Sequence, residues 1–221
     1  MKIGIVGAGN IGTNLAKRFH ELGHEVEIAN SRGPQTLTEI AREAGAVPVD
    51  VRGLAKGKDL IVVAIPMRSV PELPSDLLNE APAAAVVVDT TNYVLQQRDG
   101  RIEELEDGML ESRWVSRHLG RPVVKAFNNM GAEHLVSKAR PQGDADRVSL
   151  PVSGDDPEAK SVVLKLIDDM GFEPADVGTL EDSWRHQPGS LVYGTDLPIG
   201  ELRTALAATP RERPAKYSAA R

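Results

Sequence analysis

The sequence contains no cysteine, few aromatic residues and no long apolar run. The absence of cysteine from 221 residues excludes disulfides, thiolate metal sites and cysteine nucleophiles. Any redox chemistry would therefore belong to a bound organic cofactor. No apolar run approaches the roughly 20 residues of a membrane span, and the N-terminus has neither the basic flank nor the cleavage site of a secretory signal. We therefore expect a cytoplasmic protein that does not associate with membranes.

Positive charge is also scarcer than negative charge. Asp and Glu number 32 against 26 Lys and Arg, which gives a formal net charge of −6. An acidic balance of this kind argues against bulk binding of nucleic acid. We expect a small molecule or a ring cofactor as the substrate, and no metal site.

Short apolar runs alternate with amphipathic stretches along the chain. The runs occupy residues 2–6, 25–29, 59–65, 85–89, 122–127 and 147–152. They are apolar throughout rather than at every second position, which predicts strands covered on both faces. The stretches between them predict helices at 11–22, 37–44, 73–79, 109–118, 157–170 and 198–207. This alternation predicts an α/β fold with a doubly wound, mostly parallel sheet.

The composition divides the chain near residue 178. Residues 1–178 contain the alternating strands and helices, and residues 179–221 form a small C-terminal segment. Within that segment, residues 209–221 carry basic side chains, two prolines and little apolar content. This composition predicts a disordered or weakly docked arm.

A glycine-rich turn follows the first predicted strand. Its residues are Gly7-Ala8-Gly9-Asn10-Ile11-Gly12, a G-x-G-x-x-G pattern between a strand and a helix. In this context the first glycine permits the tight turn, the second lets the backbone approach a pyrophosphate, and the third lets the helix pack closely on the strand. The start of the helix supplies free N–H groups to the phosphates. The plainer alternative is a glycine-rich turn without a ligand.

The second predicted strand ends without the acidic residue that NAD enzymes place there. The chain instead reads Asn30-Ser31-Arg32-Gly33-Pro34. These residues offer a hydroxyl, a guanidinium and a new helix start where a 2′-phosphate would lie, so we expect NADP rather than NAD. The alternative is that Arg32 is a solvated charge and that Asn30 and Ser31 only form a turn.

Three further strand ends carry small, amide or hydroxyl side chains. They are Ala64-Ile65-Pro66-Met67-Arg68, Asp89-Thr90-Thr91-Asn92 and Phe127-Asn128-Asn129-Met130-Gly131-Ala132. In a doubly wound sheet the ligand lies across the carboxyl ends of the strands. Side chains of these types can hold a carboxamide and a flat ring by hydrogen bonds. Each segment taken singly could also be an ordinary turn.

Candidate proton donors are few, and none has an acidic partner at a useful spacing. Lys125, within a predicted strand, fits a structural ion pair as well as a site residue. His118 and His134 are expected to be exposed on helices, and His186 lies in a polar run. We therefore assign no catalytic residue. Hydride transfer between two ring cofactors, which asks the enzyme for no proton, fits this pattern.

These segments resemble the NADPH-dependent coenzyme F420 reductase family. The likeness rests on residues 1–32, with the glycine-rich turn and Ser31-Arg32, and on Ala64-Ile65-Pro66, Val124-Lys125-Ala126-Phe127-Asn128, Val152-Ser153-Gly154-Asp155-Asp156 and Gly171-Phe172. It extends over residues 1–178 and is shared by the cytoplasmic NADPH domains of the membrane metalloreductases.

The resemblance implies a Rossmann-like NADP domain with a small C-terminal part. Members of the family transfer hydride between NADP and a deazaflavin such as F420 or a flavin such as FMN or FAD. By position, the resemblance places Ala8, Gly9, Asn10 and Ile11 at the pyrophosphate, Ser31 and Arg32 at the 2′-phosphate, and Ile65, Asn92 and Ala132 at the ribose and nicotinamide.

The sequence departs from the family where the second substrate would bind. Deazaflavin-binding members carry a His-Thr-Ile-Pro type segment after the sixth strand, whereas this chain has Asn128-Asn129-Met130-Gly131. The run from Trp184 to Gly189 and the segment Leu191-Val192-Tyr193-Gly194 replace an apolar C-terminus. Asn128, Asn129, Met130 and Tyr193 are therefore candidates for the substrate side, although Trp184 and Tyr193 fit core or surface packing better than a site role.

Two other functions are consistent with the sequence. The first half of the chain also resembles pyrroline-carboxylate reductases and β-hydroxyacid dehydrogenases, which favours reduction of a small imine or carbonyl, but their long helical second domain is missing. A dinucleotide-binding sensor or partner protein without turnover is the other. A homodimer is expected if a neighbouring copy closes a half-open site.

Overall fold

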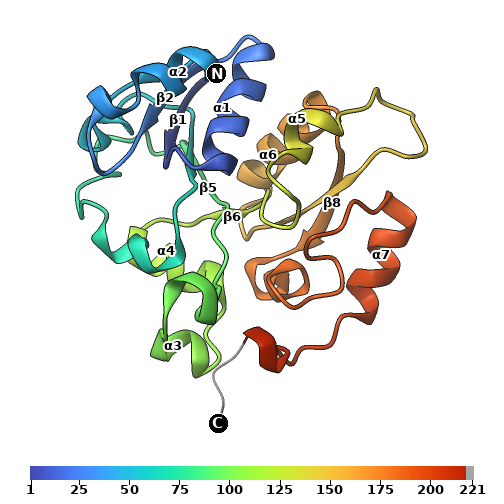
Figure 1. Ribbon diagram of the computed structural model, residues 1–221. Coiled ribbons are helices and arrows are strands. Elements are labelled where there is room, and N and C mark those ends of the chain that lie inside the picture. Colours follow the sequence, from blue (N-terminus) through green and yellow to red (C-terminus); the bar gives the residue numbers. More distant parts are fainter. Residues whose placement is uncertain (218–221) are drawn as a thin grey trace.

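The computed structural model, which describes residues 1–217, has a central sheet with helices packed on it (Figure 1). Within these residues eight strands lie in the order β3-β2-β1-β4-β5-β6-β7-β8. Their bounds are β1 (Lys2–Val6), β2 (Glu25–Ala29), β3 (Val47–Pro48), β4 (Leu60–Val63), β5 (Val86–Asp89), β6 (Val124–Lys125), β7 (Ser149–Ser153) and β8 (Glu173–Gly178). All neighbouring strands are parallel except β6 and β7. The predicted α/β fold with a doubly wound, mostly parallel sheet is confirmed.

The helices predicted at 11–22, 37–44, 109–118, 157–170 and 198–207 are present, with ends that differ by at most two residues. In full, the helices are α1 (Asn10–Glu21), α2 (Thr38–Ala44), α3 (Glu103–Glu106), α4 (Glu111–Leu119), α5 (His134–Ser137), α6 (Pro157–Asp169) and α7 (Ile199–Ala208). Local chemistry explains several of the ends. The Asp156 carboxylate accepts hydrogen bonds from the backbone N–H groups of Glu158 and Ala159 and caps α6. Gly45 and Gly120 end α2 and α4 in the left-handed conformation.

The two faces of the sheet bury separate apolar cores. Ile3 and Ile5 of β1 pack with Phe19 of α1 and Leu166 of α6 in one core. Val63 of β4 packs with Trp114 and Val115 of α4 in the other. Because both faces are covered, the strands are apolar at successive positions, and the polar ends of the strands become the place where a ligand can be held.

The helix predicted at residues 73–79 is wrong. A 3₁₀ segment at Met67–Glu72 with Pro71 inside it precedes a series of turns. Leu73 is extended, with ψ of 145°, because the following Pro74 disfavours the helical conformation of its neighbour. The strand predicted at 122–127 is also shorter than expected, since only Val124–Lys125 pairs in the sheet.

The C-terminal segment packs beside β8 at one edge of the sheet, where Val192 and Leu202 share a small apolar core with Ala175. It comprises a 3₁₀ segment at Leu180–His186, α7 and a short turn at Ala215–Tyr217. The sequence predicts disorder or weak docking for 209–221. Within residues 209–217, Arg213 donates to the buried carboxylate of Glu111 at 2.7 Å, which is one contact between this arm and the domain. The rest of that prediction, at 218–221, falls outside the described residues.

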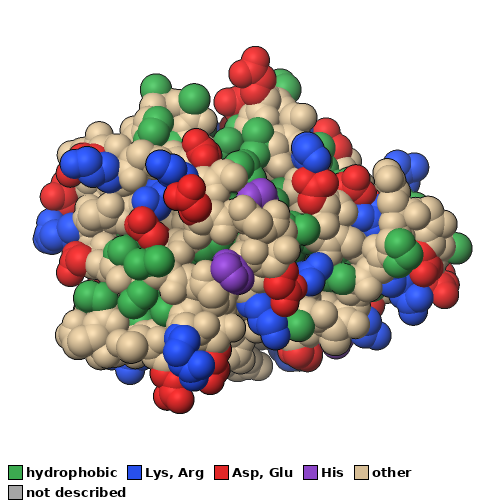
Figure 2. All heavy atoms as spheres, turned by 90° about the horizontal axis from the view of Figure 1, so that it is seen from above, with side chains coloured by type: hydrophobic (Ala, Val, Ile, Leu, Met, Phe, Trp, Pro, Cys, Tyr) green, Lys and Arg blue, Asp and Glu red, His purple; other side chains and the backbone are tan. Residues whose placement is uncertain are grey.

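No helix within residues 1–217 is long and apolar enough to cross a membrane. The same residues contain no group of three or more His, Asp or Glu side chains arranged to hold a metal ion. Figure 2 shows acidic and basic side chains interspersed over the upper face of the molecule rather than gathered by sign.

Candidate functional site

The turn between β1 and α1 is shaped by two glycines that tolerate no side chain. Gly7 has a φ of +112°, and a Cβ on it would lie 2.2 Å from the carbonyl oxygen of Ala64. A Cβ on Gly12 would lie 2.0 Å from the carbonyl oxygen of Gly7. Real Cβ atoms cannot approach oxygen so closely, so both positions require glycine. The roles predicted for Gly7 and Gly12, the tight turn and the close packing, match this geometry.

Gly9 differs from its two neighbours because it faces open space. A Cβ built on Gly9 would meet nothing within 4 Å. Gly9 is the N-cap of α1, its φ of −81° is open to any residue, and no side chain caps the helix. The first N–H groups of α1 therefore have no intrahelical partner and face this space. The uncapped start of α1, with open space beside Gly9, can accommodate the pyrophosphate of a dinucleotide.

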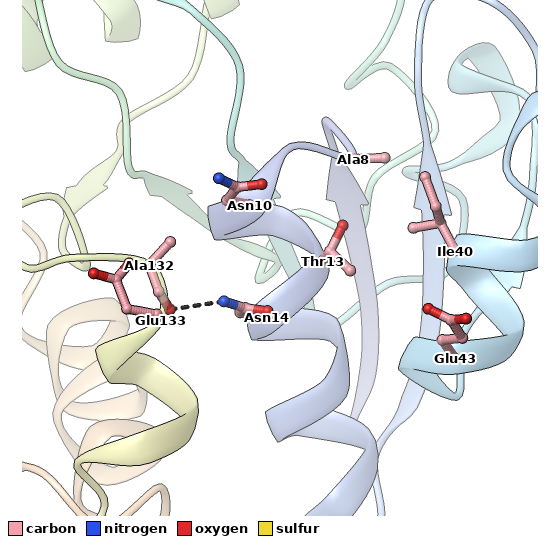
Figure 3. A pocket seen from close by; sticks show the side chains of 8 residues that line it. All are labelled: Ala8, Asn10, Thr13, Asn14, Ile40, Glu43, Ala132 and Glu133. Atoms are coloured by element: carbon pink, nitrogen blue, oxygen red, sulfur yellow. Dashed lines mark hydrogen bonds between the residues drawn. The ribbon is translucent and has the colours of Figure 1, made fainter.

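A cavity of about 310 Å³ lies beside this turn. Figure 3 shows that the side chains lining it come from the glycine-rich turn, α1, α2 and the segment between β6 and α5. They are Ala8, Asn10, Thr13, Asn14, Ile40, Glu43, Ala132 and Glu133. The Asn14 amide donates to the carbonyl oxygen of Ala132 at 2.7 Å. This bond brings Ala132 to the glycine-rich turn, so three predicted residues, Ala8, Asn10 and Ala132, share one cavity.

The turn after β2 holds Arg32 at the surface without an ionic partner. Asn30 Oδ1 accepts from the backbone N–H of Arg32 at 2.9 Å, and Asn30 Nδ2 donates to Thr36 Oγ1 at 3.0 Å. Both polar atoms of the Asn30 side chain therefore help to close the turn. Arg32 is exposed and forms no ion pair with any residue in 1–217. Ser31 is also exposed, so this turn leaves a hydroxyl and a guanidinium available to a ligand.

The ends of β1 and β4 lie together. The Ala64 N–H donates to the carbonyl oxygen of Val6 at 2.8 Å. The Ile65 side chain lies 2.8 Å from the position of a Cβ on Gly7, and Ile65 and Pro66 are half-buried. The segment after β4 thus forms one wall beside the glycine-rich turn, as the sequence predicts.

The ends of β5 and β6 are joined by a pair of amides. Asn92 Nδ2 donates to the carbonyl oxygen of Asn128 at 2.9 Å, and Asn128 Nδ2 donates to Asn92 Oδ1 at 3.1 Å. Phe127, just before Asn128, has a φ of +59° and is the one non-glycine residue among 1–217 in the left-handed region. Its ring is fully buried and meets Phe19 edge-on at 6.4 Å. The core holds the ring in place, so the strained backbone persists and turns Asn128 towards Asn92.

The substrate-side candidates do not form an open surface. Asn128, Asn129 and Met130 are at most 6% exposed. Tyr193 is half-buried, and its ring meets Tyr217 edge-on at 6.3 Å. Both amide atoms of Asn129 are buried without a hydrogen-bond partner in the described part of the chain. Asn128, Asn129 and Met130 are therefore buried rather than facing solvent, and Asn128 contacts His186 of the C-terminal segment.

Lys125 has a structural position in the sheet. Its ammonium lies 3.2 Å from Asp89 Oδ2, both side chains are fully buried, and the ammonium also donates to the carbonyl oxygen of Thr91. The Ser112 hydroxyl donates to the same Asp89 oxygen at 2.7 Å. Of the two roles considered from sequence, the geometry matches the ion pair, which fixes the end of β5 just before Asn92.

The histidines differ in their surroundings. His118 Nδ1 lies 2.8 Å from the carbonyl oxygen of Trp114, and His134 Nδ1 lies 2.9 Å from Asp196 Oδ1. His186 is fully buried, and burial together with the charge of Lys125 lowers its pKa to about 3. The sequence shows a polar run around His186, which hides this burial. The partners of His186 come from distant segments and could not be found by spacing.

Comparisons with known proteins give a consistent family. The family model "NADP oxidoreductase coenzyme F420-dependent" matches residues 2–93. A hypothetical protein from Sinorhizobium meliloti of known structure is 30% identical, with 90% of this chain and 95% of that chain covered and a TM-score of 0.75. A proposed F420-dependent NADP reductase from Arthrobacter sp. FB24 is 27% identical, with 83% and 87% covered and a TM-score of 0.68.

A curated relative extends the match to a different group of proteins. Metalloreductase STEAP3 of Rattus norvegicus is 30% identical over 183 residues, which are 81% of this chain and 34% of that protein. The chain spans between 34% and 56% of the length of the curated relatives it matches.

A matched pair of glycine substitutions tests the pyrophosphate site. We expect Gly9→Ala to keep the thermal midpoint of unfolding near that of the unchanged protein, because its Cβ enters open space. NADP affinity should fall at least about tenfold, because the methyl group occupies the place of the phosphates. Gly12→Ala should instead destabilise the fold, since its Cβ meets the Gly7 backbone. Calorimetric titration and thermal unfolding measure both, and unchanged NADP affinity in Gly9→Ala would contradict the site.

The buried histidine predicts a pH dependence of stability. His186 stays neutral in the folded protein down to about pH 3, whereas its ordinary pKa is 6.5. Between these values the unfolded chain binds more protons, so the free energy of unfolding falls as the pH is lowered from 6.5 towards 3, by up to about 1.4 kcal/mol per pH unit. His186→Gln should flatten this slope relative to the unchanged protein in denaturant titrations. Identical slopes for the two proteins would show that His186 gains a proton in the folded state.

Proposed function

This chain belongs to the family of coenzyme F420-dependent NADP oxidoreductases, and from that membership we propose that it transfers hydride between NADP(H) and a deazaflavin or flavin. The observation that carries the proposal is the open space at Gly9 in front of the uncapped start of α1. This space lies at the carboxyl ends of parallel strands, where doubly wound sheets bind dinucleotides.

The residues around this space divide the cofactor among three places. The N–H groups of Asn10 and Ile11 at the start of α1 would bind the pyrophosphate. Ser31 and Arg32 would bind the 2′-phosphate, and Ile65, Asn92 and Ala132 would line the ribose and nicotinamide. When bound, NADPH supplies the hydride. The protein's part is to hold the ring in place beside its reaction partner.

The preference for NADP over NAD rests on the turn after β2. An NAD site places an acidic side chain there to bind the ribose hydroxyls. Here the exposed Ser31 and Arg32 stand at this position, and Arg32 has no ionic partner among residues 1–217. A guanidinium without a competing carboxylate suits a phosphate dianion.

A ring acceptor is favoured over a carbonyl or imine by how the ionisable groups near Asn92 are used. Lys125 is paired with Asp89, and His186 is buried and neutral. Neither is placed to give a proton to a substrate. A flavin-type ring can take a hydride and delocalise the resulting negative charge over its own atoms, so it asks the protein for positioning rather than for an acid. F420, FMN and FAD are the acceptors that this proposal covers.

The quaternary state and location expected from sequence remain predictions. A homodimer could complete the hydride-acceptor side with residues of a second copy.

Arg32 provides a direct test of the choice of cofactor. Arg32→Ala should weaken NADPH binding about tenfold or more, because a charge-assisted contact to the phosphate is lost. NADH binding should change less than about twofold, a difference too small to reflect a lost contact. Arg42→Ala is the matched control, since it removes an exposed arginine from nearby α2. Equal weakening of NADPH and NADH by Arg32→Ala would remove Arg32 from the phosphate site.

The acceptor class is tested by turnover. NADPH oxidation by the purified full chain is followed through nicotinamide absorbance with F420, FMN, FAD, riboflavin, a cyclic imine and a simple ketone. We expect rapid oxidation with one or more of the ring acceptors only. Turnover with the imine or ketone would establish the small-substrate reaction in its place. If the protein binds NADPH but does not oxidise it with any of these acceptors, the sensor function would be favoured.

A further inference from the structure

A chain of polar side chains connects β7 to the end of β5 through the C-terminal segment. Ser153 Oγ lies 2.9 Å from His186 Nε2, and His186 Nδ1 lies 3.0 Å from Asn128 Oδ1. Asn128 then bonds to Asn92. Ser153 and His186 are fully buried, and Asn128 is 3% exposed. The chain therefore runs from the interior of the domain to a half-buried residue of the candidate cofactor site.

The hydrogen-bond pattern fixes each polar atom in this series of side chains as either a donor or an acceptor. The two hydrogens of Asn128 Nδ2 go to Asn92 Oδ1 and to the carbonyl oxygen of His186, at 3.1 and 2.7 Å. Asn128 Oδ1 must therefore accept, and His186 Nδ1 must carry the proton that it accepts. His186 Nε2 is then an acceptor for the Ser153 hydroxyl. A single neutral tautomer of His186 satisfies every contact.

This arrangement leaves Asn92 with one donor and one acceptor unused. Of its two amide hydrogens, one is donated to the carbonyl oxygen of Asn128, and its Oδ1 accepts from Asn128 Nδ2. One N–H and one lone pair of the Asn92 amide remain. Asn92 is half-buried at the end of β5. A primary carboxamide, such as that of nicotinamide, offers the matching acceptor and donor.

Two contacts with Asn128 orient the Asn92 amide: Nδ2 donates to the backbone carbonyl oxygen, and Oδ1 accepts from the Asn128 side chain, whose own orientation can change. An amide can turn by 180° and exchange its oxygen and nitrogen, and then Asn128 would present a carbonyl oxygen to Asn92 Oδ1. Two groups of His186 oppose this turn: its Nδ1–H would face an NH₂ group instead of an oxygen, and its backbone carbonyl oxygen would face Asn128 Oδ1 instead of the Nδ2 donor. The backbone supports the same arrangement, since His186 is held in the 3₁₀ segment Leu180–His186, which begins with a capping box formed by Thr179 and Asp182.

We propose that His186 is a positioning residue: by donating from Nδ1 to Asn128, it holds the Asn92 amide in the orientation that binds the nicotinamide carboxamide. The inference rests on the proposed function, because it assumes that NADP occupies the site. It assigns a role in cofactor binding to the C-terminal segment, which lies outside the glycine-rich turn and the turn after β2.

Two substitutions at this one position separate the two ring nitrogens. In His186→Asn the amide nitrogen can replace Nδ1 and keep the bond to Asn128. In His186→Gln the longer amide reaches the place of Nε2, keeps the Ser153 contact and leaves Asn128 without its donor. Binding of NADP and of 2′,5′-ADP, which lacks the nicotinamide, is measured for each variant by calorimetric titration.

We expect a loss confined to the nicotinamide end. His186→Gln should weaken NADP about tenfold while 2′,5′-ADP binding stays within about twofold, and His186→Asn should keep both within about threefold. Equal weakening of both ligands, or no weakening of either, would overturn the positioning role. So would equal behaviour of the Asn and Gln variants.

Two further measurements keep the test decisive if a variant does not fold or if the unchanged protein does not bind the ligands. If His186→Gln does not fold, Asn92→Ala takes its place and should produce the same selective loss of NADP, and equal loss of both ligands would again overturn the proposal. If the unchanged protein binds neither NADP nor 2′,5′-ADP, the proposed function itself has failed. A different result, in which NADP and 2′,5′-ADP both bind equally well with and without the His186 donor, would leave the proposed function standing and overturn only the positioning role.

Discussion

The close contact of backbone with backbone between β1, the glycine-rich turn and α1 is the constraint on which the candidate site depends. Gly12 lies against the carbonyl group of Gly7, and Gly7 lies against that of Ala64. No other residue type fits either position, so the start of α1 and the wall formed after β4 are fixed relative to each other. The open space at Gly9 exists because its neighbours on both sides are packed as tightly as backbone atoms allow.

A second constraint acts at the opposite end of the site through buried polar groups. The buried Lys125–Asp89 ion pair fixes the end of β5. The Asn92–Asn128 pair joins the end of β5 to the end of β6. Buried groups of this kind stabilise a fold only when every partner is present. The geometry near Asn92 is therefore specified by hydrogen bonds, whereas the geometry near Gly9 is specified by steric contact. The two ends of the candidate site are therefore held by different forces.

Much of the fold, and the residues proposed to bind the cofactor, could be predicted from short segments of the sequence. The first strand and the glycine-rich turn are contiguous in the sequence, and Ser31-Arg32 closely follow the next strand, so the spacing within one strand-helix-strand unit predicts their arrangement. The helix predicted at 73–79 is absent because Pro71 and Pro74 disfavour helical backbone in this segment, despite its apolar spacing. The burial of His186 and Asn129 depends on contacts between segments more than 50 residues apart, such as the His186–Asn128 bond. No periodicity in a single sequence records such contacts.

The seam between β6 and β7 has a consequence for how such a protein can change over evolutionary time. These strands run antiparallel and pair at a single position, Lys125 with Ser153, whereas β7 pairs with β8 along most of its length. Residues 149–217 thus form a module attached to the dinucleotide half by few backbone bonds. Side chains still cross this seam, since Leu166 of α6 packs with Ile3 and Phe19 in one core, so this part can diverge only where that core is kept. New reaction partners can then be acquired by descent without rebuilding the nucleotide-binding half.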